Sequence, residues 1–182
     1  TGRFDIMYAP GGLAQTYGRF IYGYLIATSE KRDLLPGIAS AWELSKDGKT
    51  WTFTVRDGVK FHDGKSVTAE DLWWSLMHYY GKDESGAAAE RATGSSFLAQ
   101  AKRTEKVELA RHDQVSITTK FADAGFAATT FSEASSDWYG VLPKRPKVHD
   151  AAQEAAYDKN PIAAWQMKLV RHVPSDVMAF ER

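Results

Sequence analysis

The sequence predicts a mixed α+β fold in which antiparallel strands pack against helices. Three observations support this prediction: a strictly alternating apolar strand, an amphipathic helix with signals at both ends, and a second strand pair farther along the chain. The chain has 182 residues, of which 43% are hydrophobic and 25% are charged. This is the composition of an ordinary globular domain that can bury a sizeable core.

The first periodic segment predicts a helix over residues 13–25. Its apolar residues recur at spacings of three and four, which place them on one helix face. They are Leu13, Tyr17, Phe20, Ile21, Tyr24 and Leu25. Gly18 and Gly23 lie inside the segment and weaken the helix. The longest apolar run, 20–27, is far shorter than the roughly 18 residues that a membrane-spanning helix needs.

The clearest strand covers residues 50–55. Trp51, Phe53 and Val55 alternate with three threonines, so one face of the strand is apolar and the other carries hydroxyls. Asp-Gly turn signals stand at 47–48, 57–58 and 63–64. A shorter alternating segment, 59–61, lies between the last two turns, and together they predict a meander.

A helix is predicted to begin after Thr68. Asp71 stands three residues later, as in a capping box, and Glu70 adds negative charge at the positive end of the helix dipole. The apolar stripe that follows consists of Leu72, Trp73, Leu76, Met77 and Tyr80. Gly81 can adopt the left-handed conformation that ends a helix, so the helix is expected to stop there.

The remaining elements are predicted from turn residues and alternation. Residues 82–96 are rich in Gly, Ala and Ser and are expected to form a loop. After the loop we expect a hairpin at 107–117 around the turn 111–114. A helix is expected from Asp150 to Tyr157, and Asn160-Pro161 stops it. The last elements are two strands, 168–173 and 177–181, around the turn 174–176.

Charge and residue types exclude several functions. Lys plus Arg and Asp plus Glu both number 23, so the zero net charge provides no field for a nucleic-acid backbone. The chain has no cysteine for nucleophilic catalysis or for a thiolate metal site. Its five histidines include no pair spaced to share a helix face, so no metal site and no cofactor is predicted. His62-Asp63 could act as a base, but the following Gly64 favours a structural turn.

Aromatic side chains are plentiful and fall into two groups. Trp42, Trp51, Phe53, Phe61 and Trp73 lie on periodic apolar faces and are expected to pack in the core. A second group lies among turn-forming residues, where an aromatic side chain either packs in the core or lines a ligand pocket. This group contains Tyr8, Trp138, Tyr139 and Trp165.

Three stretches in order resemble the family 5 extracellular solute-binding proteins, the peptide, dipeptide, nickel and opine receptors of ABC importers. They read Leu35-Pro36-Gly37-Ile38-Ala39-Ser40-Ala41-Trp42, then Asp47-Gly48-Lys49-Thr50-Trp51-Thr52-Phe53-Thr54-Val55-Arg56-Asp57-Gly58-Val59-Lys60-Phe61-His62-Asp63-Gly64, then Val67-Thr68-Ala69-Glu70-Asp71-Leu72. The resemblance continues through the 107–120 hairpin, Leu142-Pro143-Lys144, Asn160-Pro161 and Lys168-Leu169-Val170.

The resemblance implies a clamshell of two lobes, of the type II periplasmic-binding-protein kind. Family members run to about three times this length, against a common domain size of about 100–150 residues. We therefore expect residues 1–182 to be a fragment, the N-terminal lobe without the second lobe. Within it we expect an inserted α+β subdomain at 28–157 and a partial core subdomain formed by 1–27 and 158–182.

The function that the resemblance implies is non-catalytic capture of a small polar, peptide-like solute between the lobes. The implied partners are the ligand, the second lobe and ABC permease subunits in the membrane, and the implied location is periplasmic or anchored at the cell surface. The residues expected to face the ligand are Tyr8, Gly12, Tyr139, Trp165 and Gln166. The ligand stays open among peptide, metal chelate, opine and sugar.

One departure from the family pattern lies next to the expected cleft. Where relatives carry a turn similar to Gly-Thr-Gly-Pro-Tyr, this chain has Ala163-Ala164-Trp165-Gln166-Met167. Two functions of other classes remain as alternatives. One is a small hydrolase built on His62, Asp63 and a serine, and the other is a protein-interaction module that docks through exposed tryptophans.

Overall fold

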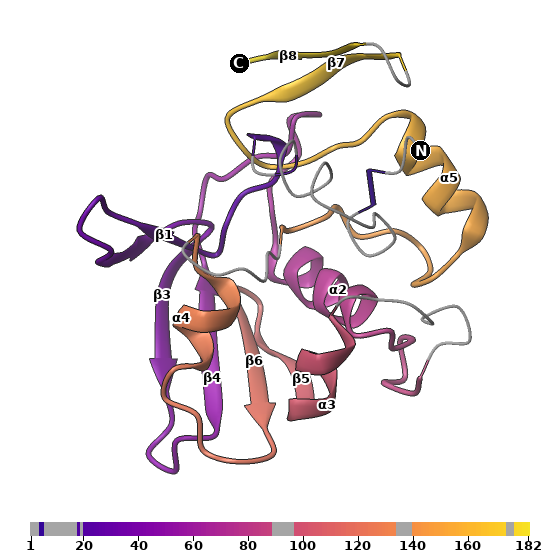
Figure 1. Cartoon of the computed structure of the whole chain (residues 1–182). Helices are drawn as coiled ribbons and strands as arrows, with labels where there is room; N and C mark the ends of the chain where they lie inside the picture. Colours follow the sequence, from indigo (N-terminus) through magenta and orange to yellow (C-terminus); the bar gives the residue numbers. More distant parts are fainter. Residues whose placement is uncertain (1–3, 6–17, 19, 89–96, 134–139, 174–176) are drawn as a thin grey trace.

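The structure is a computed structural model, and it describes residues 4–5, 18, 20–88, 97–133, 140–173 and 177–182. The strands, labelled in Figure 1, are β1 (Ile26–Thr28), β2 (Leu34–Pro36), β3 (Ala39–Leu44), β4 (Thr50–Val55), β5 (Thr104–Arg111), β6 (Gln114–Thr119), β7 (Lys168–Val173) and β8 (Val177–Glu181). The helices are α2 (Ala69–Tyr79), α3 (Leu98–Arg103), α4 (Phe126–Phe131) and α5 (Ala151–Lys159). The predicted mixed α+β class is confirmed.

A four-stranded antiparallel sheet in the order β3-β4-β6-β5 forms the lower part of the molecule in Figure 1. The predicted strand 50–55 is β4, and its apolar residues are buried as the alternation predicts. In the register with β6, Phe53 pairs with Val115, and both side chains are buried. On the opposite face, the hydroxyls of Thr50 and Thr118 lie 3.1 Å apart. The predicted hairpin 107–117 is the β5–β6 pair.

The alternating segment 59–61, expected as part of a meander, pairs less extensively than a strand of the sheet. These residues take part in an isolated antiparallel bridge between Lys60 and Ser66. The turns at Gly58 and Gly64, both with positive φ, bound this segment, and its pairing around the second turn is limited to the amide of Phe61 donating to the Lys65 carbonyl at 2.8 Å and the amide of Val67 donating to the Val59 carbonyl at 2.9 Å.

The helix predicted after Thr68 is α2, and its start is a complete capping box. The Asp71 amide donates to the Thr68 hydroxyl at 3.2 Å, and the Thr68 amide donates to the Asp71 carboxylate at 2.9 Å. The helix ends at Tyr79, and Gly81 follows with φ +64°, as predicted.

Helix α2 is buried on two sides, which the apolar stripe did not predict. One side packs against β5 and β6. The other side meets the segment 140–148, where the Leu142 amide donates to the Ser75 hydroxyl at 2.8 Å and the Tyr79 hydroxyl donates to the Gly140 carbonyl at 2.6 Å. Trp74, outside the predicted stripe, is therefore 1% exposed, whereas Trp73 of the stripe is only partly buried.

The helix predicted over residues 13–25 ends earlier than expected. Residues 18, 20 and 21 are helical, but the chain leaves the helix at Tyr22 and enters β1 at Ile26. Gly23 explains the change, since its backbone lies against Ile38 and against the segment around Ala164. Residues 13–17 lie outside the described part of the chain.

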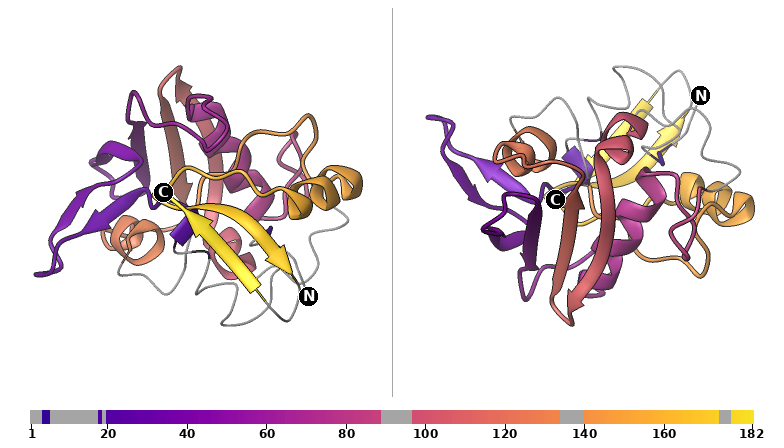
Figure 2. Two further views of the ribbon diagram at one scale, coloured as in Figure 1. Left: turned by 90° about the horizontal axis from the view of Figure 1, so that it is seen from above. Right: turned by 90° about the horizontal axis from the view of Figure 1, so that it is seen from below.

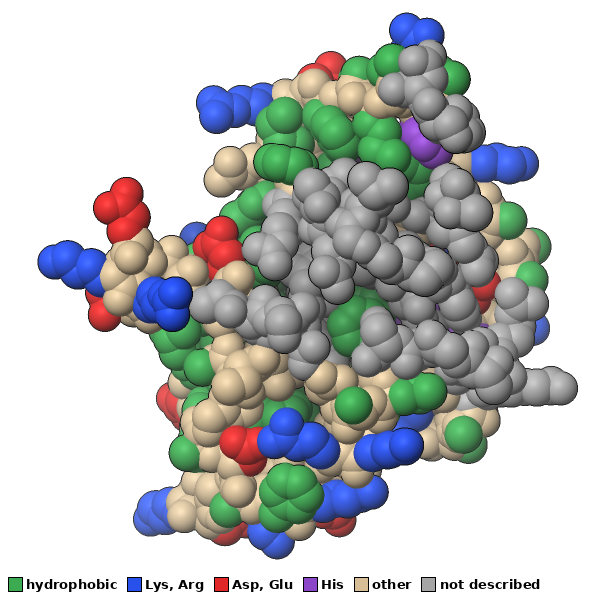
Figure 3. Space-filling model, in the orientation of Figure 1, with side chains coloured by type: hydrophobic (Ala, Val, Ile, Leu, Met, Phe, Trp, Pro, Cys, Tyr) green, Lys and Arg blue, Asp and Glu red, His purple; other side chains and the backbone are tan. Residues whose placement is uncertain are grey.

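Two hairpins extend from the body. The β1–β2 hairpin projects away from the rest of the molecule in both views of Figure 2, with Leu34 and Leu35 exposed near its end. The β7–β8 hairpin lies on the upper part of Figure 1 and exposes Val170, Val177 and Met178. Hydrophobic side chains gather on this upper part of the surface in Figure 3.

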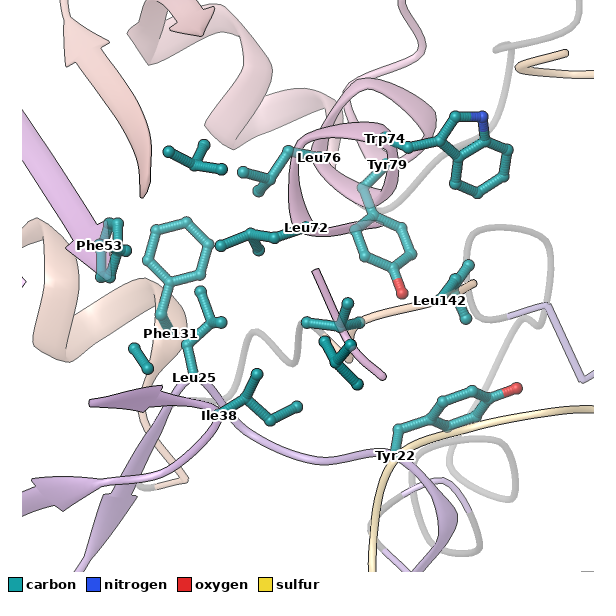
Figure 4. Close-up of a cluster of buried hydrophobic side chains, with 14 of the residues drawn as sticks. Tyr22, Leu25, Ile38, Phe53, Leu72, Trp74, Leu76, Tyr79, Phe131 and Leu142 are labelled. Atoms are coloured by element: carbon teal, nitrogen blue, oxygen red, sulfur yellow. The ribbon is translucent and has the colours of Figure 1, made fainter. Parts of the chain in front are cut away.

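One continuous core joins these layers. Figure 4 shows Phe53 of the sheet, Leu72 of α2 and Phe131 of α4 turned toward one another, with the rings of Phe53 and Phe131 5.1 Å apart. The core continues past Ile38 to Tyr22. The aromatic residues that the sequence placed in the core are buried or pack against it. None of the helices in the described part of the chain has the length and apolarity of a membrane span.

Candidate functional site

The turn 163–167 is the part of the predicted ligand-facing set that the structure describes. It connects α5 to β7. Ala163 and Ala164 are buried, Trp165 is partly buried, and Gln166 is exposed. Tyr8, Gly12 and Tyr139 lie outside the described residues, as does Trp138. The turn therefore offers an aromatic ring and an adjacent exposed amide, two groups suited to orienting a small ligand.

Hydrogen bonds from two distant segments hold this turn. The His62 amide donates to the Ala163 carbonyl at 2.9 Å, and His62 Nε2 lies 3.0 Å from the Trp165 carbonyl oxygen. On the other side, the Met167 amide donates to the Phe20 carbonyl at 3.1 Å. The meander after β4 and the segment before β1 thus fix the turn from outside.

Packing places the Trp165 side chain. Its ring meets that of Tyr24 edge to face, with centroids 6.1 Å apart and an interplanar angle of 89°. A Cβ built on Gly23 would lie 2.8 Å from Trp165 Cε3 and 2.9 Å from the Ala164 carbonyl oxygen, closer than real atoms approach. Only glycine therefore allows the turn to lie this close to the backbone at residue 23.

The electrostatics of His62 favour a neutral ring. Burial lowers its pKa, and the nearby Lys168 acts in the same direction, whereas the bond to the Trp165 carbonyl and the charge of Asp63 oppose the shift. Because a carbonyl only accepts, the proton of the neutral ring lies on Nε2. Nδ1 is buried and has no hydrogen-bond partner among the described residues.

The geometry favours a structural turn over a catalytic dyad at His62-Asp63. The Asp63 carboxylate accepts from the Lys65 amide at 3.1 Å and pairs with the Lys65 ammonium at 3.0 Å. The His62 ring is bonded to a backbone carbonyl. The Asp63 side chain is thus used within its own turn, and the His62 ring is used to hold the turn 163–167.

A second polar site, which sequence reasoning missed, lies buried between the chain start and α2. The Asp5 carboxylate lies 2.9 Å from His78 Nε2 and accepts from Arg145 Nη2 at 2.9 Å. Burial alone would raise the pKa of Asp5, but His78 and Arg145 together lower it to about 2. The Arg145 guanidinium also lies over the ring of Trp74, 4.5 Å from its centroid. No sequence signal joins these residues, because 140 positions separate Asp5 from Arg145.

Next to this site, three potential metal ligands come together from separate elements. They are His78, His149 and Glu154, all buried, and their ligand atoms lie within 4.8 Å of one another. The Nε2 atom of His78 is already used, because it lies 2.9 Å from the Asp5 carboxylate. The Arg145 guanidinium, 3.4 Å from the same nitrogen, adds positive charge that opposes binding of a cation there. The arrangement favours a packed polar core, in which the two imidazole rings stack at 4.8 Å.

Comparisons with known proteins agree with the resemblance. Residues 33–182 match the family "Bacterial extracellular solute-binding proteins, family 5 Middle". Di/tripeptide-binding protein 1 of Pseudomonas aeruginosa is 30% identical over 133 residues, which cover 66% of this chain and 25% of that protein. The dipeptide-binding protein of Escherichia coli is 41% identical over 66 residues, which cover 33% of this chain and 12% of that protein.

Among solved structures, NikZ of Campylobacter jejuni in complex with Ni(L-His) superposes with a TM-score of 0.76. The identity is 21%, and the match covers 100% of this chain and 33% of NikZ, so the likeness shows the fold. The chain thus spans about a third of the length of NikZ and aligns with a quarter or less of the two sequence relatives. Since the family match extends over residues 33–182, the chain belongs to the bacterial extracellular solute-binding proteins of family 5.

Proposed function

We propose that the complete protein is the substrate-binding component of an ABC importer, which captures a small polar, peptide-like solute in a cleft between two lobes. The family match over residues 33–182 carries this proposal. Relatives named for binding dipeptides and tripeptides favour a peptide-like ligand. The protein releases the solute unchanged to permease subunits in the membrane, and it works in the periplasm or at the cell surface.

In this proposal residues 1–182 form one lobe, and the turn 163–167 is part of its ligand-facing surface. Trp165 supplies an apolar wall and Gln166 an orienting amide, together with Tyr8, Gly12 and Tyr139. The lobe itself has an inserted subdomain, 28–157, and a core subdomain made from 1–27 and 158–182. The amides of Phe4 and Asp5 both donate to the Asp158 carboxylate, at 2.7 and 2.9 Å, which supports pairing of the two ends in one subdomain.

The test uses the full-length protein purified without refolding. Native mass spectrometry is expected to detect a co-purified solute bound to the protein. After denaturation, the released solute should have the same mass that it added to the complex. Calorimetric titration with trialanine after removal of that solute then measures binding of a peptide. Conversion of the co-purified solute to a product would favour the hydrolase alternative, in which case His62→Ala abolishes turnover.

The two-lobe account also makes a prediction for residues 1–182 alone. Because half of the ligand contacts would come from the second lobe, the isolated lobe is expected to bind trialanine at least a hundredfold more weakly than the full-length protein. Equal affinity of the two forms would contradict capture between lobes.

A further inference from the structure

His62 connects the stretch 47–64, one of those that resemble the family, to the turn 163–167 of the proposed ligand surface. It follows β4 in the chain, but its hydrogen bonds reach the turn 163–167, 103 positions away. Both polar groups of His62 that bond to the turn act as donors, the amide to the Ala163 carbonyl and ring Nε2 to the Trp165 carbonyl. Two bonds from one residue fix both the place and the direction of a short turn.

We infer that His62 is a positioning residue for the ligand-facing surface: through Nε2 it holds the Trp165 backbone, so that the indole keeps one orientation toward the ligand. This inference rests on the proposed function, because it takes the turn 163–167 to meet the ligand. His62 itself is not placed in contact with the ligand.

The packing explains why one hydrogen bond has this effect. Trp165 lies against Gly23 on one side and meets Tyr24 edge to face. The contact at Gly23 leaves no space for the ring to move inward. Movement outward is opposed by the bond from His62 Nε2 to the Trp165 carbonyl. The backbone at Gly23 thus limits movement of the indole on one side. On the other side, the hydrogen bond from His62 fixes the backbone of Trp165.

Of the two nitrogens of the His62 ring, only Nε2 is needed to hold the turn. The carbonyl of Trp165 needs a donor at the position of Nε2, whereas Nδ1 has no hydrogen-bond partner among the described residues. A glutamine side chain places its amide nitrogen close to the position of Nε2, and an asparagine side chain places its nitrogen close to that of Nδ1. Glutamine at position 62 can therefore replace the hydrogen bond of Nε2, whereas asparagine cannot. Comparing the two substitutions shows whether residue 62 acts through this hydrogen bond or only through the volume of its side chain.

The experiment compares three variants of the full-length protein, His62→Ala, His62→Asn and His62→Gln, by hydrogen exchange with mass spectrometry. The reporter is a peptide that contains the Met167 amide, which is bonded to the Phe20 carbonyl. We expect exchange in this peptide to be about three- to tenfold faster in His62→Ala and His62→Asn, the effect of losing one hydrogen bond. We expect His62→Gln to stay within about twofold of the original protein.

Two controls separate this effect from general loss of stability. A peptide that covers β4 should exchange at the same rate in all variants, because its hydrogen bonds lie in the sheet. His112→Ala changes a histidine in the β5–β6 turn whose side chain is 92% exposed, and it should leave the peptide with Met167 unchanged.

Binding of trialanine, measured by calorimetry, supplies the second readout. His62→Ala and His62→Asn are expected to weaken binding about three- to tenfold, and His62→Gln is expected to restore it. Unchanged exchange at residues 163–167 in His62→Ala would overturn the inference, and so would faster exchange with unchanged trialanine affinity. If the original protein does not bind trialanine, the proposed ligand class fails, and the exchange data with the glutamine rescue decide the role of His62 by themselves.

Discussion

The start of α2 and the turn 163–167 are both held by side chains bonded to backbone groups, but over very different distances along the chain. At α2, Thr68 and Asp71 bond each other's amides three positions apart. At the turn, His62 reaches a carbonyl 103 positions away. The first arrangement can form in an isolated segment, whereas the second exists only once the lobe has folded. Local bonds thus define elements, and distant bonds fix the turn that we propose faces the ligand.

The largest expected effect tests the most distant interactions. Asp5→Asn removes the charge that pairs with both His78 and Arg145 in the buried site. Because Arg145 then stays buried without its carboxylate, we expect the free energy of unfolding to fall by about 3–5 kcal/mol. Urea unfolding at neutral pH measures this loss.

The matched control for Asp5→Asn is Glu43→Gln, which neutralises an exposed carboxylate on β3. It should shift the urea midpoint very little. A loss below about 1 kcal/mol for Asp5→Asn would mean that the buried site contributes no more than an ordinary hydrogen bond.

The pH dependence of stability distinguishes the buried Asp5 site from His62, which holds the turn 163–167. The pKa of Asp5 is about 2 in the folded chain against 3.8 for an ordinary aspartate, so its contribution is present above pH 3.8 and is lost as the pH falls toward 2. This contribution is about 2 kcal/mol. Unfolding curves between pH 5 and 2 measure it, and its persistence in Asp5→Asn would assign it to another group.

His62, like Asp5, contributes stability that is lost as the pH falls, but it does so at higher pH than Asp5. Its pKa is lowered in the folded chain, so its contribution is present above pH 6.5 and is lost as the pH falls below that value. His62→Gln removes this step, since glutamine does not titrate. Exchange of the peptide with Met167 between pH 7.5 and 5, corrected for the intrinsic pH dependence of exchange, is the measurement.

A smaller loss is expected from Gly23→Ala. The added Cβ would lie 2.7 Å from Ile38 Cδ1 and 2.8 Å from Trp165 Cε3, so one of these contacts must move. We expect destabilisation of about 1–3 kcal/mol and altered fluorescence of Trp165. Gly125→Ala is the control, because its Cβ would meet no described atom closer than 3.6 Å. Equal effects of the two substitutions would show that the contact at Gly23 does not position the turn.

The smallest expected effect concerns the cap at the start of α2. Thr68→Ala removes the N-cap of α2 and is expected to cost about 1 kcal/mol in thermal or urea unfolding. Thr68→Ser keeps the hydroxyl and should retain most of the stability. A loss in Thr68→Ser as large as that in Thr68→Ala would assign the effect to the methyl group and not to the cap.

The sequence predicted the elements whose signals lie within a few residues. The strand at 50–55, the capped starts of α2 and α5 and the β5–β6 hairpin were all predicted and are present. Elements without such signals were missed. In strand β3 a register shift between Ala39 and Ala41 interrupts the alternation, and α3 and α4 are six-residue helices without a side-chain cap.

The candidate site was predictable only in part. The family resemblance and the turn residues pointed to Trp165 and Gln166, but no spacing connects His62 with Trp165 or Asp5 with Arg145. Each of these pairs joins segments more than 100 positions apart. Such contacts depend on how elements stack, and the sequence pattern of one element does not contain that information.

By itself the sequence determined the α+β class, the main turns and caps, and the family to which the chain belongs. Only the tertiary structure decided that α2 is covered on both sides, that Gly23 lies against Trp165, and that His62 bonds the turn 163–167. The physical reason is that hydrogen-bond spacing and alternation act over a few residues. Burial and ion pairing instead depend on which distant segments meet once the chain is compact.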